Sequence, residues 1–203
     1  MIKSNDSYSR KYCVEIWGDA KDKSFKKRPY KKGQHGRTAM SKNTPDAKAR
    51  KHAQILKIHY GLSEKDFRIL MSKAKNMKGN IIDNIAVLLE SCPMIIAYRA
   101  KLSPTMFSAR QMVSHRNVLL NGKKCFRKET VKAGDVISIP EKIKSSQHFI
   151  NSIANLERPI PDYISSDTEL RTAKFLRNPS FRELYISKLI DINGVVSRYT
   201  RMI

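Results

Sequence analysis

The chain has 203 residues, of which 40% are hydrophobic, so it is long enough for one or two domains with a packed core. Lysine and arginine total 40 against 18 acidic residues, which gives a formal charge of +22. Repulsion between like charges at that density opposes a compact fold. So high a positive charge is explained by a polyanionic partner, of which nucleic acid is the commonest. A solvated basic surface without a partner is the plainer alternative.

The sequence argues against a membrane partner and against a metal site. It contains no apolar stretch of about 18 residues, the length that a membrane-spanning helix needs, and its N-terminus lacks the apolar core of a secretory signal. Cys13, Cys92 and Cys125 are far apart and form no C-x-x-C pair, which fits a reducing compartment. We therefore expect no membrane partner, no metal and no cofactor.

Residues 1–43 form a basic N-terminal extension with little regular apolar spacing. Between Lys21 and Arg37 there are eight basic residues and one acidic residue. Within this stretch, the proline and glycines of KRPYKKGQHG (27–36) disfavour both helix and strand. We expect the extended segment to become ordered on its partner, with Tyr30 and His35 stacking and the lysines meeting phosphates. A plain disordered tail is the alternative.

A small helical domain is predicted at residues 44–92, completed by residues 175–203. Three stretches of helical apolar spacing each follow a residue that can cap a helix: Thr44, Ser63 and Asn80. Gly61 suits the end of the first helix, because glycine readily takes the backbone conformation that closes a helix.

Residues 93–174 are predicted to form a second module, with helices packed on a small, mainly antiparallel sheet. Met94–Leu102 has the spacing of a short helix, and Ser103 with Pro104 suits the start of the next one. That next helix has an apolar and a polar face, with Met106, Ala109, Met112 and Val113 inward, and Phe107, Arg110, Gln111 and Ser114 outward.

A tight hairpin is predicted directly after this helix, at VLLNGKK (118–124), because Asn-Gly favours the positive φ angles of a type I′ turn. VKAGDVISI (131–139) adds a turn and a strand. Residues 141–180 are irregular, and residues 181–203 fit either a helix or a strand. The predicted class is therefore α+β, with a helical domain, a helix-and-sheet module and a basic extended N-terminal segment.

Five motifs in a fixed order carry a family resemblance: KRPYKKGQHG, LLES followed by YR, SARQMVSH, VLLNGKK and VKAGDVISI. The ordered set resembles universal small-subunit ribosomal protein four of the bacterial type, from about Arg10 to Pro179, with its embedded RNA-binding module. The resemblance implies a structural protein, not an enzyme, that is a primary binder of small-subunit ribosomal RNA. It implies a role in starting subunit assembly and a position near the path by which the messenger enters.

The resemblance also implies partners and a location. Small-subunit protein five is the expected neighbour, at an interface that influences translational accuracy, and no small-molecule substrate is expected. The ribosome would lie in a bacterial cytoplasm or a mitochondrial matrix, since heavy use of Lys, Ile and Asn fits either kind of AT-rich genome.

The chain departs from the family pattern at four places, one of which is the last twenty residues, where the match is poor. CPM (92–94) follows Glu-Ser where relatives have Arg-Leu-Asp, and Arg116-Asn117 stands where relatives have Gly-His. Many relatives carry an N-terminal cysteine cluster for zinc, whereas this chain has only Cys13 in that region, so no zinc is expected.

We predict two RNA-contact surfaces, because lysine and arginine bind phosphates and a structured RNA is recognised largely by shape. The first joins the basic segment to the first predicted helix: Arg28, Tyr30, Lys31, Lys32, Gln34, His35, Arg37, Lys48, Arg50 and Lys51. The second is the helix–hairpin edge: Arg110, Gln111, Ser114, His115, Arg116, Lys123 and Lys124. Arg99 is a further expected contact.

Two alternative functions use the same helix-and-hairpin module: an RNA-modifying enzyme or tyrosyl-tRNA synthetase, and a free RNA chaperone. An enzyme would need a catalytic domain, and the sequence presents no Ser/His/Asp set, paired carboxylates or P-loop. His115 has no nearby carboxylate in the sequence to support it as a general base, so an RNA or capping contact is favoured.

Overall fold

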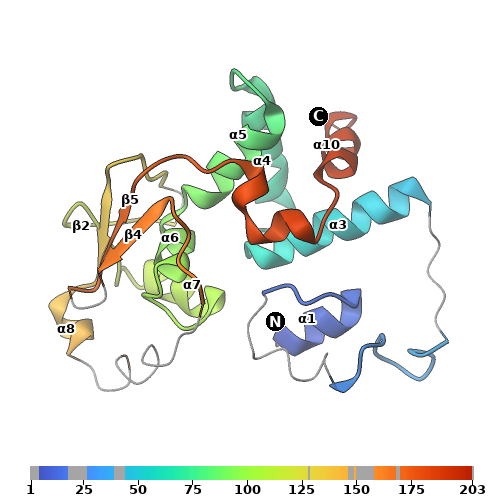
Figure 1. Ribbon diagram of the computed structural model, residues 1–203, viewed down its shortest axis with the longest axis horizontal. Helices are drawn as coiled ribbons and strands as arrows, with labels where there is room; N and C mark the ends of the chain where they lie inside the picture. The colour runs from blue at the N-terminus through green and yellow to red at the C-terminus, as the bar shows by residue number, and fades with distance from the viewer. Residues whose placement is uncertain are drawn as a thin grey trace. The chain divides into compact units, whose positions relative to one another are not determined.

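The computed structural model describes residues 5–17, 27–38, 44–127, 129–145, 149, 158–167 and 170–202, whose elements are drawn in Figure 1. Contacts divide the chain into two compact units, a helical unit (Met1–Lys78 with Arg182–Ile203) and a sheet unit (Gly79–Phe181). The predicted α+β class is confirmed. The predicted domain boundary between residues 92 and 93 stays a prediction. By its contacts, helix α5 (Ile81–Glu90) belongs to the sheet unit.

The helical unit is built from helices that pack on one long helix. Its described elements are α1 (Asn5–Tyr12), α3 (Pro45–His59), α4 (Glu64–Asn76), η2 (Tyr185–Lys188) and α10 (Ile192–Thr200), with η1 (Phe181–Glu183) at its border in the sequence. Helix α10 packs against α3 and α4, and α1 packs against α3. Phe67 and Tyr199 meet edge to face, with ring centroids 4.8 Å apart, in the core between α4 and α10.

Helices α3 and α4 begin at the caps that the sequence predicted. The Thr44 hydroxyl accepts a hydrogen bond from the Ala47 N–H at 3.3 Å, and the Ser63 hydroxyl accepts one from the Asp66 N–H at 3.1 Å. Each cap satisfies a backbone donor that has no partner within its own helix. Gly61 follows α3 in the left-handed conformation, as predicted, with φ at 61°.

Part of the N-terminal extension that was predicted to be extended is helical and anchored. After α1, Ile16 and Trp17 are 0% and 6% exposed. The Tyr185 hydroxyl donates to the Glu15 carbonyl at 3.0 Å, and His59 Nδ1 donates to the Ile16 carbonyl at 2.8 Å. Two large apolar side chains and two long-range hydrogen bonds therefore order a stretch that has no helical apolar period of its own.

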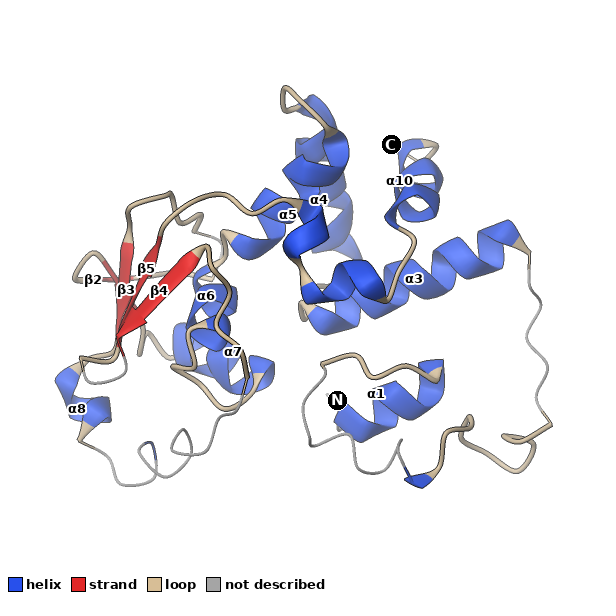
Figure 2. Ribbon diagram, viewed as in Figure 1, coloured by secondary structure: helices blue, strands red, loops and turns tan. Residues whose placement is uncertain are grey.

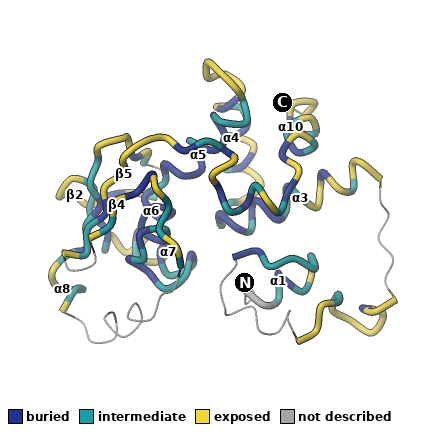
Figure 3. Tube along the Cα trace, viewed as in Figure 1, coloured by how far each residue is buried: buried dark blue, intermediate teal, exposed yellow. Residues whose placement is uncertain are grey.

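The sheet unit carries five short strands and four helices among its described residues (Figure 2): α5, α6 (Pro93–Arg99), α7 (Met106–Ser114), β1 (Leu119–Leu120), β2 (Lys123–Lys124), β3 (Val136–Ser138), α8 (Glu141–Lys144), β4 (Ile164–Asp167) and β5 (Thr172–Phe175). The strand order is β2-β1-β3-β5-β4, and neighbouring strands are antiparallel. Helix α6 packs on β3 and β5, and α7 packs on α6. Burial is concentrated along α6, where residues 93–98 are all buried, whereas β3, β4 and β5 each bury only some of their residues (Figure 3).

Two predictions for this unit need correction or completion. Helix α7 begins at Met106 with Thr105 as its cap, not at Ser103 with Pro104, because Arg158 binds the Ser103 and Pro104 carbonyls at 2.8 and 3.1 Å and holds them outside the helix. Strands β4 and β5 arise within the stretch that the sequence left unassigned.

At the chain end, the sequence left the choice between helix and strand open. The structure shows 3-10 turns and helix α10 there.

A buried ion pair fixes α6 in the sheet unit. Glu90, at the end of α5, is 0% exposed and lies 3.0 Å from the Arg99 guanidinium. The Tyr163 hydroxyl donates to the same carboxylate at 3.0 Å. A buried carboxylate requires a paired cation. The motif LLES followed by YR thus supplies both partners of the pair.

Within the described residues, no single helix is long and apolar enough to cross a membrane, while α5 and α6 together meet that test by length and composition across a 78° bend. Most of the apolar side chains of these two helices are buried in the sheet unit.

Candidate nucleic-acid interface

The helix–hairpin edge consists of the outer face of α7, the residues after it, and the β1–β2 hairpin. Met106, Ala109 and Val113 of α7 are buried, as predicted, whereas Met112 is only half-buried. Among the predicted contacts on this edge, Arg110 is half-buried and six are exposed: Gln111, Ser114, His115, Arg116, Lys123 and Lys124. Burial of the apolar face therefore turns the polar face of the helix outward.

The Asn121-Gly122 turn has the predicted form, with φ angles of 49° and 80°. Leu120 pairs with Lys123 across the hairpin, and both Lys123 and its neighbour Lys124 are exposed. The hairpin consequently presents two adjacent ammonium groups without burying either one.

Two hydrogen bonds of the Asn121 side chain fix this turn to the sheet. The Asn121 side-chain N–H donates to Asp135 at 2.9 Å, and its side-chain oxygen accepts from the Val136 N–H at 2.9 Å. The hydrogen bond from Asn121, followed by one from the Lys132 backbone, holds the pKa of Asp135 below its ordinary value. The side chain that shapes the turn therefore also sets its position on β3.

Arg116 joins the helix to the hairpin in the left-handed conformation, with φ at 58°. This is the backbone state that glycine takes without strain, so the residue that departs from the family pattern keeps the glycine-like geometry. Its guanidinium lies over the Phe126 ring, 5.3 Å from the centroid. The departure thus adds a charge and an aromatic contact without removing the turn.

The basic segment 28–37 contains neither helix nor strand, as predicted, and is organised around Tyr30. The guanidinium groups of Arg37 and Arg10 lie over the Tyr30 ring, 5.0 and 5.7 Å from its centroid. The hydrogen bond from Arg37 lowers the pKa of Tyr30 below its ordinary value. Tyr30, predicted to stack on the partner, is therefore already stacked with two cations of its own chain.

Gly36 makes the tight turn of this segment possible. A side-chain carbon at that position would lie 2.0 Å from the Lys31 carbonyl oxygen, which is a clash that no rotamer relieves. Around this turn, Lys31 is half-buried, Lys32 bonds to the Ser7 hydroxyl, and the other predicted contacts are exposed: Arg28, Gln34, His35 and Arg37.

Three further predicted contacts lie on α3, where Lys48, Arg50 and Lys51 are exposed. Arg50 pairs with Asp46 at 3.1 Å, and Arg198 of α10 pairs with the same carboxylate. An exposed pair of this kind is worth about 0–1 kcal/mol, so Arg50 can exchange its carboxylate for a phosphate at small cost.

Arg99 is placed differently from the other predicted contacts. Its side chain is 12% exposed and is paired with the buried Glu90 carboxylate. Moving the guanidinium to a phosphate would leave that carboxylate buried and uncompensated, which is costly. The geometry therefore favours a structural role for Arg99.

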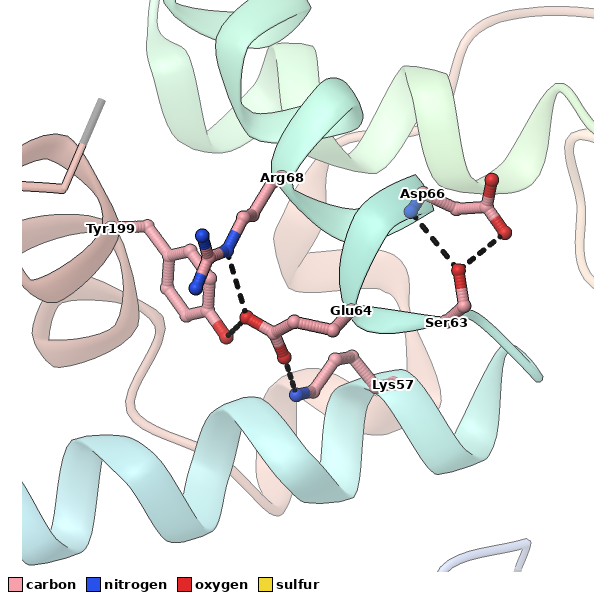
Figure 4. Close-up of polar contacts among 6 residues, drawn as sticks. All are labelled: Lys57, Ser63, Glu64, Asp66, Arg68 and Tyr199. Atoms are coloured by element: carbon pink, nitrogen blue, oxygen red, sulfur yellow. Dashed lines mark hydrogen bonds and ion pairs between the residues drawn. The ribbon is translucent and has the colours of Figure 1, made fainter.

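A polar cluster that the sequence did not indicate ties helix α10 to α3 and α4 (Figure 4). Glu64 accepts hydrogen bonds from Lys57, from the Tyr199 hydroxyl at 3.0 Å and from Arg68 at 3.2 Å. The bond from Lys57 is the main reason that the pKa of Glu64 is lowered, and burial raises the pKa of Tyr199 to about 12. No local pattern indicated the cluster, because Tyr199 lies 135 residues from Glu64.

The chemistry available on these surfaces is that of cations, amides and aromatic rings. Among the described residues, no group of three or more His, Cys, Asp or Glu side chains is placed to hold a metal ion. Cys92 and Cys125 are protonated thiols near neutral pH, because burial raises the pKa of each to about 11. The arrangement suits polyanion binding.

Two models of known protein families match the chain and define the class of protein to which it belongs. Residues 94–137, which contain all but the first residue of α6 together with α7 and the hairpin, match the family model described as the S4 domain. Residues 2–90 match the model described as the ribosomal protein S4/S9 N-terminal domain. The chain is therefore an S4-domain protein with a ribosomal N-terminal part.

Whole-chain relatives narrow this class to one family. The chain is 37% identical over 203 residues to the small ribosomal subunit protein uS4 of Rickettsia rickettsii (strain Sheila Smith), covering 99% of this chain and 98% of that protein. The uS4 proteins of Rickettsia felis (strain ATCC VR-1525 / URRWXCal2) and Rickettsia bellii (strain OSU 85-389) give the same identity and coverage. The chain belongs to the uS4 family. This confirms the predicted family and the prediction that the chain is not an enzyme.

Proposed function

We propose that this chain is a structural constituent of the small ribosomal subunit that binds small-subunit ribosomal RNA through the helix–hairpin edge and the basic segment. The observation that carries the proposal is 37% identity to small ribosomal subunit proteins uS4 over 99% of the chain. The formal charge of +22 and the exposed cations on both surfaces support it physically.

The proposed mechanism is phosphate neutralisation on a preformed surface. Each ammonium or guanidinium that meets a phosphate releases counterions, so affinity falls with salt by roughly 0.7 to 0.9 log units per contact for each log unit of salt. The Asn121 hydrogen bonds fix the hairpin before RNA arrives, so less ordering entropy is lost on binding. Lys123 and Lys124 supply charge, while Gln111 and Ser114 offer groups for sugars and bases.

The finer parts of the proposal follow from the family. We infer that the chain is a primary RNA binder that helps to start subunit assembly near the path of the incoming messenger, with small-subunit protein five as its neighbour and an influence on accuracy at that interface. Its location is a ribosome of the bacterial type, in a bacterial cytoplasm or a mitochondrial matrix. The uS4 relatives named above are bacterial, which supports the bacterial type.

Sedimentation combined with ultraviolet crosslinking tests the proposal. The full chain should cosediment with small subunits at moderate salt and should crosslink to small-subunit ribosomal RNA through peptides of the helix–hairpin edge. A chain that stays in the soluble fraction and gives no ribosomal RNA crosslinks would instead fit a free RNA chaperone, and the ribosomal proposal would be wrong.

A further inference from the structure

Phe126, just after the hairpin, exposes 57% of its surface, although burying a phenylalanine side chain is favourable. The ring sits on a fixed backbone. The Phe126 N–H donates to the Glu129 carboxylate at 2.9 Å, and the Glu129 N–H donates to the Phe126 carbonyl at 3.2 Å. On the other side, the buried Cys125 donates its N–H to the Val118 carbonyl at 3.3 Å. Because the backbone is held on both sides of Phe126, the exposed ring is presented to the surroundings rather than left by chance on a loose loop.

A cation lies beside this ring. The Arg116 guanidinium is 5.3 Å from the Phe126 centroid, within the range of a cation–π contact. Arg116 is itself fixed, since its left-handed backbone closes helix α7 through a hydrogen bond to the Val113 carbonyl at 3.0 Å. The exposed lysines of β2 immediately precede Cys125 in the chain. An aromatic face, a planar cation and phosphate-binding charges thus belong to one short stretch of surface.

We propose that Arg116 and Phe126 form a stacking site for an unpaired nucleobase of the bound RNA, with Lys123 and Lys124 holding the adjoining phosphates. This inference rests on the proposed function and specifies how one part of the helix–hairpin edge recognises its ligand. Aromatic rings and guanidinium planes stack on every kind of base, because each base has a π face. Sequence-specific and shape-specific RNA binding both use unstacked bases of loops and bulges in this way.

The test is a titration of the full chain with an in vitro transcript of the small-subunit ribosomal RNA from the same genome. The variant Phe126→Ala should bind roughly 5- to 150-fold more weakly, the range that corresponds to loss of one stacked base. Its salt dependence should stay equal to that of the unmodified chain, because no phosphate contact is removed. The variant Phe126→Trp should bind as well as the unmodified chain, because it keeps an aromatic face.

Two matched variants separate stacking from other causes. Leu170→Ala removes another exposed apolar side chain of the sheet unit, 62% exposed, and should leave binding unchanged. Phe126→Leu keeps apolar bulk without a π face and should bind nearly as weakly as Phe126→Ala. Thermal unfolding of each variant should match the unmodified chain, since the ring contributes little buried area.

The outcomes distinguish this inference from the function on which it rests. Unchanged affinity in Phe126→Ala, with salt-dependent binding by the unmodified chain, would overturn the stacking site and leave the proposed function intact. Full affinity in Phe126→Leu would also overturn it, in favour of a plain apolar contact. If the unmodified chain does not bind the transcript, both proposals fail together.

Discussion

Arg116 and Gly61 occupy the same position in two copies of one helix-ending motif, with φ angles of 58° and 61°. After α7, the Arg116 N–H donates to the Val113 carbonyl at 3.0 Å, and the Asn117 N–H donates to the Met112 carbonyl at 2.9 Å. Glycine takes this conformation freely, whereas other residues lose about 1–2 kcal/mol there. The helix–hairpin joint therefore holds strain that the end of α3 does not.

This strain predicts a difference between two variants of one position. Arg116→Gly and Arg116→Ala both remove the guanidinium, but only glycine relieves the left-handed backbone. After allowance for the greater freedom of glycine in the unfolded chain, Arg116→Gly should be more stable than Arg116→Ala by roughly 0.5 to 1 kcal/mol. Chemical denaturation measures the difference, and equal stabilities would contradict a left-handed Arg116. Both variants should lose RNA affinity to the same extent.

The Glu90–Arg99 pair predicts a large loss of stability. Arg99→Ala leaves a carboxylate that is 0% exposed without its cation, which should cost about 3–5 kcal/mol. The control is Arg68→Ala, which breaks a pair whose side chains are 56% and 46% exposed and should cost less than about 1 kcal/mol. Denaturant unfolding of both variants checks this. Comparable small losses, together with a shallower salt dependence of RNA binding in Arg99→Ala, would restore Arg99 as an RNA contact.

The Tyr199–Glu64 contact predicts a stability change at high pH. Burial and the hydrogen bond to Glu64 raise the pKa of Tyr199 from an ordinary value of 10.0 to about 12. A raised pKa means that the folded chain keeps this proton longer than the unfolded chain does, so the stabilisation is complete below pH 10 and is lost toward pH 12. Tyr199→Phe should therefore lose less unfolding free energy over that interval than the unmodified chain. Parallel pH profiles for the two proteins would show that Tyr199 titrates normally.

Local signals predicted the elements whose causes are local. Thr44, Ser63 and Asn80 cap helices as expected, and Asn121-Gly122 makes its turn, because each needs only residues a few positions away. Strands β4 and β5 escaped prediction because β5 is held in the sheet by pairing with β3, which lies far away in the chain, and β4 in turn pairs with β5. The start of α7 was misplaced for the same reason, since Arg158 binds the Ser103 carbonyl from 55 residues away.

In the candidate site, too, the features with local causes could be predicted from the sequence and the others could not. Exposure of Gln111, Lys123 and Lys124 followed from the spacing of their apolar neighbours and from the hairpin. Phe126 was missed because an isolated phenylalanine in a polar stretch predicts neither burial nor exposure. Its backbone is held by Glu129, and its ring lies beside the Arg116 guanidinium, a contact that only the folded chain makes.

The salt dependence of RNA binding tests the central claim most directly. The double variant Lys123→Ala/Lys124→Ala should weaken binding and reduce the slope of log affinity against log salt by about 1.4 to 1.8, the loss of two phosphate contacts. The matched control, Lys73→Ala/Lys75→Ala, removes two exposed lysines from the last turn of α4 and should leave that slope unchanged. Equal slopes for both double variants and the unmodified chain would contradict the helix–hairpin edge as an RNA-binding surface.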